Sequence, residues 1–158
     1  TTKDVWIAAL NARTISLGAK IAKKMSESEG RQIRLTELEK HGWNVYGKLG
    51  TAYSYKYDFS KCEGCKAAYQ DAFGKLGFDK FFDSEQLRQL NAIRNLLVHK
   101  AGIVDEKFLR QSKLTNLKIG DELSLMPQDV SDYCLTAINI LCDIFKIVDQ
   151  WLRENPEP

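Results

Sequence analysis

Three polar residues that lie close together in the sequence have side chains suited to chemistry: Arg94, Asn95 and His99. A histidine titrates near neutral pH, so it can accept or donate a proton. An arginine can bind two oxygens of a phosphate at once and stabilise negative charge on them. An asparagine one turn before a histidine can hydrogen-bond the imidazole or hold a phosphate. Together these residues can bind a phosphate group and move a proton.

The same residues belong to a predicted helix that begins after Ser84, a suitable N-cap, and ends at Gly102. One apolar stripe recurs at helical spacing: Leu90, Ile93 and Leu97. At about 100° per residue, a narrow polar strip forms on the other side of the helix: Arg88, Asn91, Asn95 and His99. Arg94 lies at the border of the apolar face, where a charge is costly to hold. That cost suggests a functional site.

The motif and the segments after it, GIVDEKFL and LKIGDELSL, resemble the HEPN domains over roughly Ser84 to Leu125. In that family an R-x4-6-H motif with a polar residue after the arginine marks the ribonucleases, and Arg94, Asn95 and His99 match it. The resemblance implies a metal-independent endoribonuclease without cofactors, acting in toxin–antitoxin or antiviral defence. It also implies RNA and a second copy of the chain as partners, with an antitoxin or a fused regulatory domain as a further one.

The resemblance implies a composite active site, because HEPN ribonucleases pair about a two-fold axis that brings their motifs together. RNA carries its own nucleophile, the 2′-hydroxyl, which needs a base, and the leaving 5′-oxygen needs an acid. Two copies of His99 can divide these tasks, and Arg94 can stabilise the phosphorane-like transition state. The expected products are a 2′,3′-cyclic phosphate and a 5′-hydroxyl.

The suspected site lies in the basic part of the chain. Residues 86–118 carry seven basic and two acidic side chains, a net charge of +5, whereas the whole chain carries +2. The side chains expected to contact RNA are Arg88, Asn91, Lys100, Lys107, Arg110 and Lys113. A solvated face that is rich in lysine is the alternative, and both interpretations stay open.

Each motif residue also has a purely structural interpretation. Arg94 can cap carbonyl groups or pair with Asp105, His99 can interact with the helix macrodipole, and Asn95 can cap a turn. A second functional hypothesis follows from these interpretations. It is a non-catalytic HEPN module that dimerises or binds nucleotide or RNA within a larger protein.

A metal site is not expected. Cys62 and Cys65 form a single CxxC pair, whereas a zinc site needs four ligands. Cys134 and Cys142 are eight residues apart on a predicted helix, too far to complete such a site as a unit. His41 and His99 are the two histidines. We therefore expect thiols without a metal ion.

Composition predicts one globular domain over residues 1–158, which can also be a domain excised from a longer protein. Hydrophobic residues make up 44% of the chain and charged residues 28%, both ordinary values. No apolar run is long enough to span a membrane, and no signal peptide is visible. With four cysteines, these features favour a cytoplasmic protein in a reducing compartment.

The scarcity of proline and the helical periodicities predict an all-α, up-and-down bundle of about four main helices. Long helices are expected near residues 3–28, 31–49, 86–100 and 128–155, and short ones near 67–76 and 105–112. The apolar residues around Gly120 and Asp121 predict a small β-hairpin or turn-rich arm near 117–125. The aromatic segment 51–61 alternates like a strand but lacks a partner strand. Its side chains are expected to cap the core or, as the alternative, to stack on bases.

Overall fold

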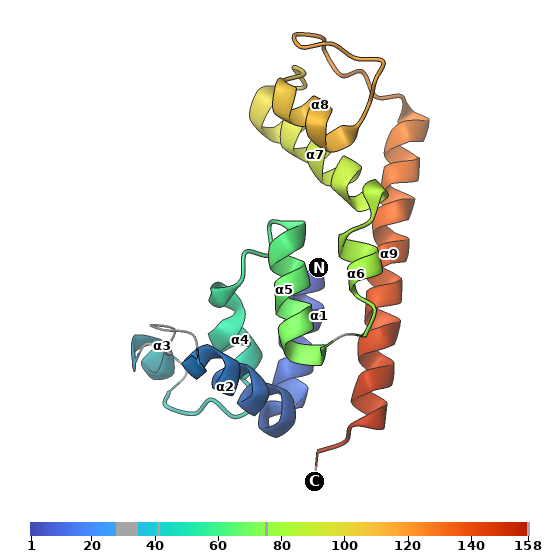
Figure 1. Cartoon of the computed structure of the whole chain (residues 1–158). Helices are drawn as coiled ribbons and strands as arrows, with labels where there is room; N and C mark the ends of the chain where they lie inside the picture. The colour runs from blue at the N-terminus through green and yellow to red at the C-terminus, as the bar shows by residue number, and fades with distance from the viewer. Residues whose placement is uncertain (28–34, 41, 75, 158) are drawn as a thin grey trace. The chain divides into compact units, whose positions relative to one another are not determined.

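The computed structural model describes residues 1–27, 35–40, 42–74 and 76–157 (Figure 1). Within these residues the chain forms helices and no strand, so the all-α prediction is confirmed. The contacts group into two compact units: unit 1 is Thr1–Phe78 with Leu141–Pro158, and unit 2 is Asp79–Ile140. The expectation of a single domain stays a prediction.

The α-helices in chain order are α1 (Thr2–Ala12), α2 (Ala19–Glu27), α3 (Leu35–Lys40), α4 (Leu49–Tyr53), α5 (Cys62–Phe73), α6 (Asp79–Phe82), α7 (Glu85–Lys100), α8 (Glu106–Ser112) and α9 (Pro127–Glu154). A π-helical turn covers Thr14–Gly18 and a 3-10 turn covers Ser54–Lys56. The helices of more than ten residues are α1, α5, α7 and α9. No helix in the described residues is both long and apolar enough to cross a membrane.

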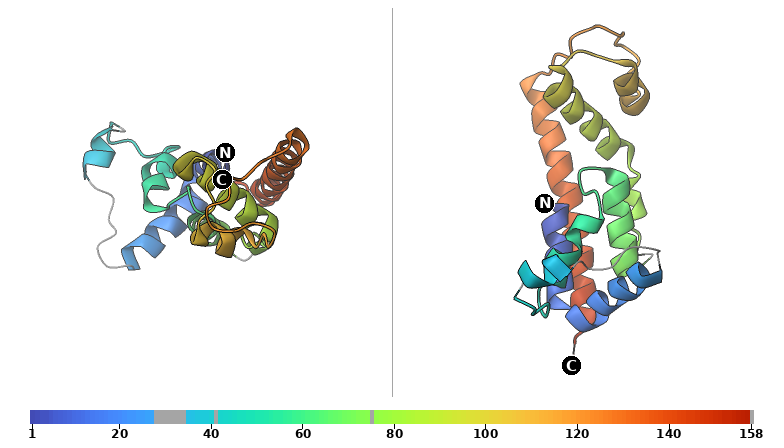
Figure 2. Two further views of the ribbon diagram at one scale, coloured as in Figure 1. Left: turned by 90° about the horizontal axis from the view of Figure 1, so that it is seen from above. Right: turned by 90° about the vertical axis from the view of Figure 1, so that its left-hand side faces the viewer.

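Unit 1 is organised around Trp6 of α1, which is fully buried. In Figures 1 and 2, α1 and α5 lie side by side, and α1 also packs against α4. The close packing of α4 requires Gly50, because a Cβ there would lie 2.3 Å from the carbonyl oxygen of Ile7. The indole Nε1 of Trp6 donates to the carbonyl of Ala68 in α5 at 2.8 Å. A large apolar ring with its one donor satisfied therefore joins these helices.

The aromatic segment caps the core in the way the sequence suggested. The rings of Tyr57 and Phe59 lie 5.4 and 5.5 Å from that of Trp6, centroid to centroid. Tyr53 is buried, whereas Tyr55 is 46% exposed. The segment continues α4 into a 3-10 turn and then becomes extended at Tyr57. Tyr57 and Phe59, the last two of the alternating aromatic residues, therefore pack on Trp6, whereas Tyr53 and Tyr55 lie in helical turns.

The first long helix is interrupted, so the prediction of one helix over 3–28 is wrong. Arg13 leaves helical geometry at φ −132° and ψ 61°, and a π-helical turn follows before α2. Its guanidinium donates to the carbonyl groups of Leu152 and Asn155 at 2.6 and 2.7 Å. Leu152 lies in the last turn of α9 and Asn155 directly follows the helix, so their carbonyl groups lack helical partners. Capping α9 accounts for the departure of Arg13 from the helix.

The helix predicted over 31–49 is also wrong in extent. Arg31–Arg34 and His41 lie outside the described residues, and α3 covers only Leu35–Lys40. Gly42, Trp43 and Gly47 all have positive φ, near 60–70° (64°, 61° and 68°). A right-handed helix cannot continue through such residues. The two glycines break the helix here.

Unit 2 begins with α6 and α7 and includes the first half of α9. Its core contains Ala92, Ile93 and Leu96 of α7 with Val104 and Phe108. α8 begins after Asp105, as predicted, and α9 matches the helix expected over 128–155. The short helix predicted over 67–76 belongs to α5, which starts earlier, at Cys62, and ends before Gly74.

The segment 117–125 is a turn-rich arm, and in the described residues it contains no hairpin. A single antiparallel bridge joins Ile103 to Glu122. Val104 donates its N–H to Asp121 at 2.8 Å and accepts from Gly120 at 2.9 Å. Gly120 takes a φ of 92°, which only glycine adopts readily. This backbone pairing holds the arm against the end of the loop that follows α7.

Candidate functional site

The helix that carries the motif has defined ends. At its start the Ser84 hydroxyl accepts from the N–H of Leu87 at 3.3 Å, as expected of an N-cap. At its end Ala101 and Gly102 both have positive φ, 49° and 83°, and both donate to the carbonyl of Leu96. The predicted stop at Gly102 is therefore spread over two residues. His99 consequently lies in the last turn of α7.

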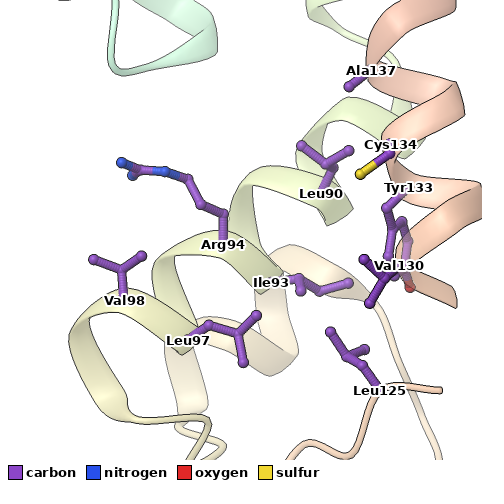
Figure 3. A pocket seen from close by; sticks show the side chains of 10 residues that line it. All are labelled: Leu90, Ile93, Arg94, Leu97, Val98, Leu125, Val130, Tyr133, Cys134 and Ala137. Atoms are coloured by element: carbon purple, nitrogen blue, oxygen red, sulfur yellow. The ribbon is translucent and has the colours of Figure 1, made fainter. Parts of the chain in front are cut away.

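α7 is covered along a wide arc of its surface. Ala92 and Leu96 pack toward Val104 and Phe108, a contact that was not predicted from the sequence. Leu90 and Leu97 lie on the side that faces α9 (Figure 3), although Leu97 is 43% exposed and is not a core residue. At 3.6 residues per turn, the remaining arc runs from Arg94 to His99 and spans roughly 140°. We call this arc the free side of α7.

The motif residues all belong to the free side. Arg94 and His99 are exposed and Asn95 is half-buried. The Nη1 group of Arg94 donates to the Oδ1 atom of Asn95 at 3.1 Å. This contact ties the amide oxygen of Asn95 to the guanidinium, whereas the sequence suggested the imidazole or a phosphate as the partner of Asn95. Asp105, the suggested ion-pair partner of Arg94, instead accepts from the N–H of Phe108 at 2.7 Å and caps α8.

The residues expected to contact RNA fall on two helices. Arg88 and Asn91 share the free side with the motif, and the guanidinium of Arg88 donates to the carbonyl of Asp83. Lys100 ends α7 and is exposed. On α8, Lys107 and Arg110 are exposed, and Lys113, the C-cap, lies 3.4 Å from a carboxylate oxygen of Glu85. All six predicted RNA-contacting residues therefore lie in unit 2. Two of them, Arg88 and Lys113, already interact with other residues of the protein.

An apolar groove adjoins the motif within unit 2 (Figure 3). Its volume is about 300 Å³, and its lining consists of Leu90, Ile93, Arg94, Leu97, Val98, Leu125, Val130, Tyr133, Cys134 and Ala137. Val98 and Val130 are 60% and 47% exposed. This groove was not predicted from the sequence. The sequence feature that could have indicated the groove is the excess of apolar residues on α7, together with the regular apolar spacing of α9. Which of these apolar side chains stay exposed depends on how the two helices pack.

The cysteine pair lies at the start of α5 in unit 1. Cys65 is buried, and its Sγ atom is 3.4 Å from the carbonyl oxygen of Phe59 and 3.7 Å from the Thr2 hydroxyl. Burial raises the pKa of the Cys65 thiol. In the part of the chain that the structure describes, no cluster of three or more His, Cys, Asp or Glu side chains could hold a metal ion. His41 lies outside that part.

Comparison of the chain with protein-family models, with curated proteins and with solved structures gives no match.

Proposed function

We propose that this protein is a metal-independent endoribonuclease of the HEPN type, acting as a homodimer in which each protomer contributes Arg94, Asn95 and His99. The resemblance between Ser84 and Leu125 motivates this proposal. The observation that carries it is the exposure of Arg94 and His99 on the same free side of α7. A guanidinium has five N–H donors and Arg94 gives one to Asn95, so both exposed side chains are available to a ligand.

Each residue has a role that its chemistry supports. His99 transfers protons, and Arg94 binds the scissile phosphate and stabilises the charge of the transition state. Asn95 orients the guanidinium through its hydrogen bond of 3.1 Å. The 2′-hydroxyl attacks the phosphorus and the 5′-oxygen leaves with a proton, so the products end in a 2′,3′-cyclic phosphate and a 5′-hydroxyl.

The dimer follows from the number of proton-transfer groups. Cleavage needs a base for the 2′-hydroxyl and an acid for the 5′-oxygen. The free side of α7 carries one histidine per chain, so two protomers together supply both groups. A two-fold axis is the usual way in which identical surfaces meet. Light scattering should therefore detect a dimer, and a monomer at high concentration would contradict this part of the proposal.

RNA is the substrate class, and the flanking contacts come from Arg88, Asn91, Lys100, Lys107, Arg110 and Lys113. Toxin–antitoxin or antiviral defence in the cytoplasm is the proposed setting, with an antitoxin or a fused regulatory domain as a further partner. The presence of four thiols is consistent with a reducing compartment.

The decisive experiment incubates wild type and His99→Ala with mixed RNA in EDTA. Wild type should cleave and leave cyclic phosphate ends, and His99→Ala should lose about 10²–10⁴ in rate, the usual contribution of general acid–base catalysis. Arg94→Ala should lose a similar amount, and Arg94→Lys should not restore activity if the phosphate contact is bidentate. His41→Ala, which replaces the other histidine, is the matched control and should keep full activity.

Two outcomes would refute the catalytic mechanism. One is cleavage that requires a divalent metal ion, and the other is cleavage that survives His99→Ala in a folded dimer. Either result would favour the non-catalytic HEPN module that dimerises or binds nucleotide or RNA. Binding of RNA without cleavage by wild type would favour the same alternative.

The basic residues of α8 supply a separate test of RNA binding. Reversing the charges of Lys107, Arg110 and Lys113 should weaken RNA binding and flatten its salt dependence, because each lost phosphate contact lowers the slope of log K against log salt by about 0.7 for a single strand. Reversal of Lys3, Lys146 and Arg153, three exposed basic residues of unit 1, changes the net charge equally and is the control. Unchanged affinity would mean that the α8 charges only solvate the surface.

A further inference from the structure

Two thiols lie in the first turn of α5. Cys62 is the first residue of the helix and Cys65 follows three residues later, so both side chains lie on the same face. In an α-helix, Cα atoms three residues apart are separated by about 5 Å, and disulfides join Cα atoms about 4.4–6.8 Å apart. The spacing of the pair therefore allows a bond between the two sulfur atoms.

The Cys65 side chain is also directed toward Cys62. Side chains of a helix lean toward its N-terminus and cover the residue three or four positions earlier. The Sγ atom of Cys65 lies 3.4 Å from the carbonyl oxygen of Phe59, which precedes the helix, and this contact agrees with that direction. The thiol of Cys65 consequently extends toward the end of α5 at which Cys62 lies.

The two thiols differ in their access to small molecules. Cys62 is half-buried, whereas Cys65 is only 6% exposed and also contacts the hydroxyl of Thr2 at 3.7 Å. Burial raises the pKa of the Cys65 thiol, so it stays protonated near neutral pH. A helix N-terminus favours the thiolate, the form of a cysteine that attacks disulfides. Cys62 can therefore react with a molecule in solution, and Cys65 can react with a sulfur atom in its own helical turn.

Gly64, between the two cysteines, brings the preceding segment close to this turn. A Cβ at Gly64 would lie 2.1 Å from the carbonyl oxygen of Asp58, so only glycine allows the approach. The same segment presents the carbonyl of Phe59 to the thiol of Cys65, and the ring of Phe59 packs on Trp6 at 5.5 Å. A chemical change at Cys65 is thus transmitted to the residues that cover Trp6.

We propose that Cys62 and Cys65 form a thiol–disulfide exchange site whose reactant is a small-molecule disulfide of the glutathione type. The thiolate of Cys62 attacks one sulfur atom of that disulfide, and one small thiolate leaves. The thiol of Cys65 then loses its proton to water and attacks the sulfur of Cys62, which releases the second small thiolate. The protein loses two electrons and the two thiol protons, and the small disulfide gains both as two thiols.

Oxidation has a structural consequence that does not depend on the proposed ribonuclease function. A sulfur atom in a disulfide carries no hydrogen, so Cys65 can no longer donate to the carbonyl of Phe59. Residues 57–61 should then be held less firmly on Trp6. Hydrogen–deuterium exchange of this segment should be faster in the oxidised protein, and exchange in α7 should not change.

Peptide mass spectrometry can follow the pair directly, because Cys62 and Cys65 fall in one tryptic peptide, Cys62–Lys66. The probe is oxidised glutathione, added to the folded protein in about 1 mM reduced glutathione. The peptide should lose two hydrogens at a concentration about tenfold or more below that which half-modifies Cys134, because a thiol in the same turn has the higher effective concentration. Cys134 and Cys142 are the matched controls. Both are exposed but lie about 12 Å apart along α9, so each should carry glutathione instead.

Two variants test the order of the two steps. Cys65→Ser removes the second thiol and keeps a hydroxyl that can donate to Phe59, so glutathione should accumulate on Cys62. Cys62→Ser replaces a half-buried residue, and it should leave Cys65 reduced because Cys65 is buried. Modification of Cys65 in Cys62→Ser at the rate of the exposed Cys134 would contradict this order of attack.

Three results would overturn the exchange site. They are a wild-type protein in which Cys62 keeps glutathione while Cys65 stays reduced, a pair that oxidises no more readily than Cys134 is modified, and a disulfide that joins two chains on a non-reducing gel. Unchanged exchange of residues 57–61 after oxidation would overturn the link to the aromatic residues on Trp6. None of these measurements involves RNA, so their failure and the failure of the proposed function are separate outcomes.

Discussion

The core around Trp6 in unit 1 and the free side of α7 in unit 2 differ in how their polar side chains are bonded. Trp6 and Tyr69 are fully buried, and each satisfies its one donor: the indole on the carbonyl of Ala68, and the phenol on the carbonyl of Thr2 at 2.7 Å. Burial raises the pKa of Tyr69 far above its usual value, so the phenol stays a donor. Throughout the described residues, no buried side-chain nitrogen or oxygen lacks a partner.

The free side of α7 has the opposite character. Arg94 and His99 are exposed, and the guanidinium of Arg94 donates one hydrogen bond, to its sequence neighbour Asn95. Exposed hydrogen bonds contribute little to stability, because water competes for both partners. The difference separates residues that hold the fold from residues that remain available for binding. It predicts that substitutions around Trp6 will lower the free energy of unfolding, whereas substitutions at Arg94 and His99 will lower activity and leave stability unchanged.

The largest effect on stability should come from Trp6→Ala. Truncating a buried tryptophan removes its contacts with Tyr57 and Phe59 and the hydrogen bond from its indole to the carbonyl of Ala68, so a loss of about 3–5 kcal/mol is expected. Urea unfolding followed by far-UV circular dichroism measures this loss. Trp43→Ala is the matched control, because Trp43 is 64% exposed, and it should change stability by less than about 0.5 kcal/mol. Equal losses in the two variants would remove the basis for assigning Trp6 to the core.

A smaller effect is expected from Gly50→Ala, at the contact between α4 and α1. The new Cβ would lie 2.3 Å from the carbonyl oxygen and 2.8 Å from the Cα of Ile7, and backbone atoms cannot move aside. We expect a loss of about 1–3 kcal/mol, the usual cost of overpacking, measured by thermal unfolding. Gly18→Ala is the control, since its Cβ would meet the flexible end of Leu49. If Gly18→Ala costs as much as Gly50→Ala, the close approach of α1 and α4 is not what Gly50 provides.

The sequence predicted those elements whose signals are local. The periodicity of α7 and α9, the N-caps Ser84 and Asp105, and the strip of polar residues on α7 all follow from the 3.6-residue repeat and from capping chemistry. The break in the first helix could not be predicted in this way, because Arg13 leaves the helix to bind a carbonyl group 139 residues away. No pattern within a short window contains that information.

The candidate site could be predicted from the sequence only where its features depend on local spacing. Periodicity placed Arg88, Asn91, Asn95 and His99 on one polar strip and Arg94 at the border of the apolar face. It did not predict that Ala92 and Leu96 are buried, because that depends on where Val104 and Phe108 dock after the chain reverses. The groove was missed because exposure of its walls depends on the packing of α7 with α9. Side-chain types and repeats identify candidate residues, and tertiary contacts decide which of them water can reach.

The helix cap at Asp105 should have an effect of about 1 kcal/mol, and it tests whether Asp105 serves α8 or Arg94. Asp105→Ala removes the acceptor for the N–H of Phe108, so it should destabilise the protein by that amount in urea unfolding. Glu106→Ala, the next residue, is the control and should have less effect. In the double variant with Arg94→Ala, the two losses should add, because the structure gives the residues no shared contact. An interaction energy above about 0.5 kcal/mol would support the ion pair between Arg94 and Asp105.

The smallest effect on stability is expected from the free side of α7 itself. Alanine at Arg94, Asn95 or His99 should change the free energy of unfolding by less than about 0.5 kcal/mol, because Arg94 and His99 are exposed and the bond between Arg94 and Asn95 is accessible to water. Leu96→Ala, a buried residue of the same helix, is the control and should lose about 2–5 kcal/mol. The three alanine variants would then retain the melting curve of the wild type while Arg94→Ala and His99→Ala lose cleavage. A loss of stability above about 1 kcal/mol in Arg94→Ala or His99→Ala would mean that the residue holds the fold, and any loss of activity in that variant could no longer be assigned to chemistry.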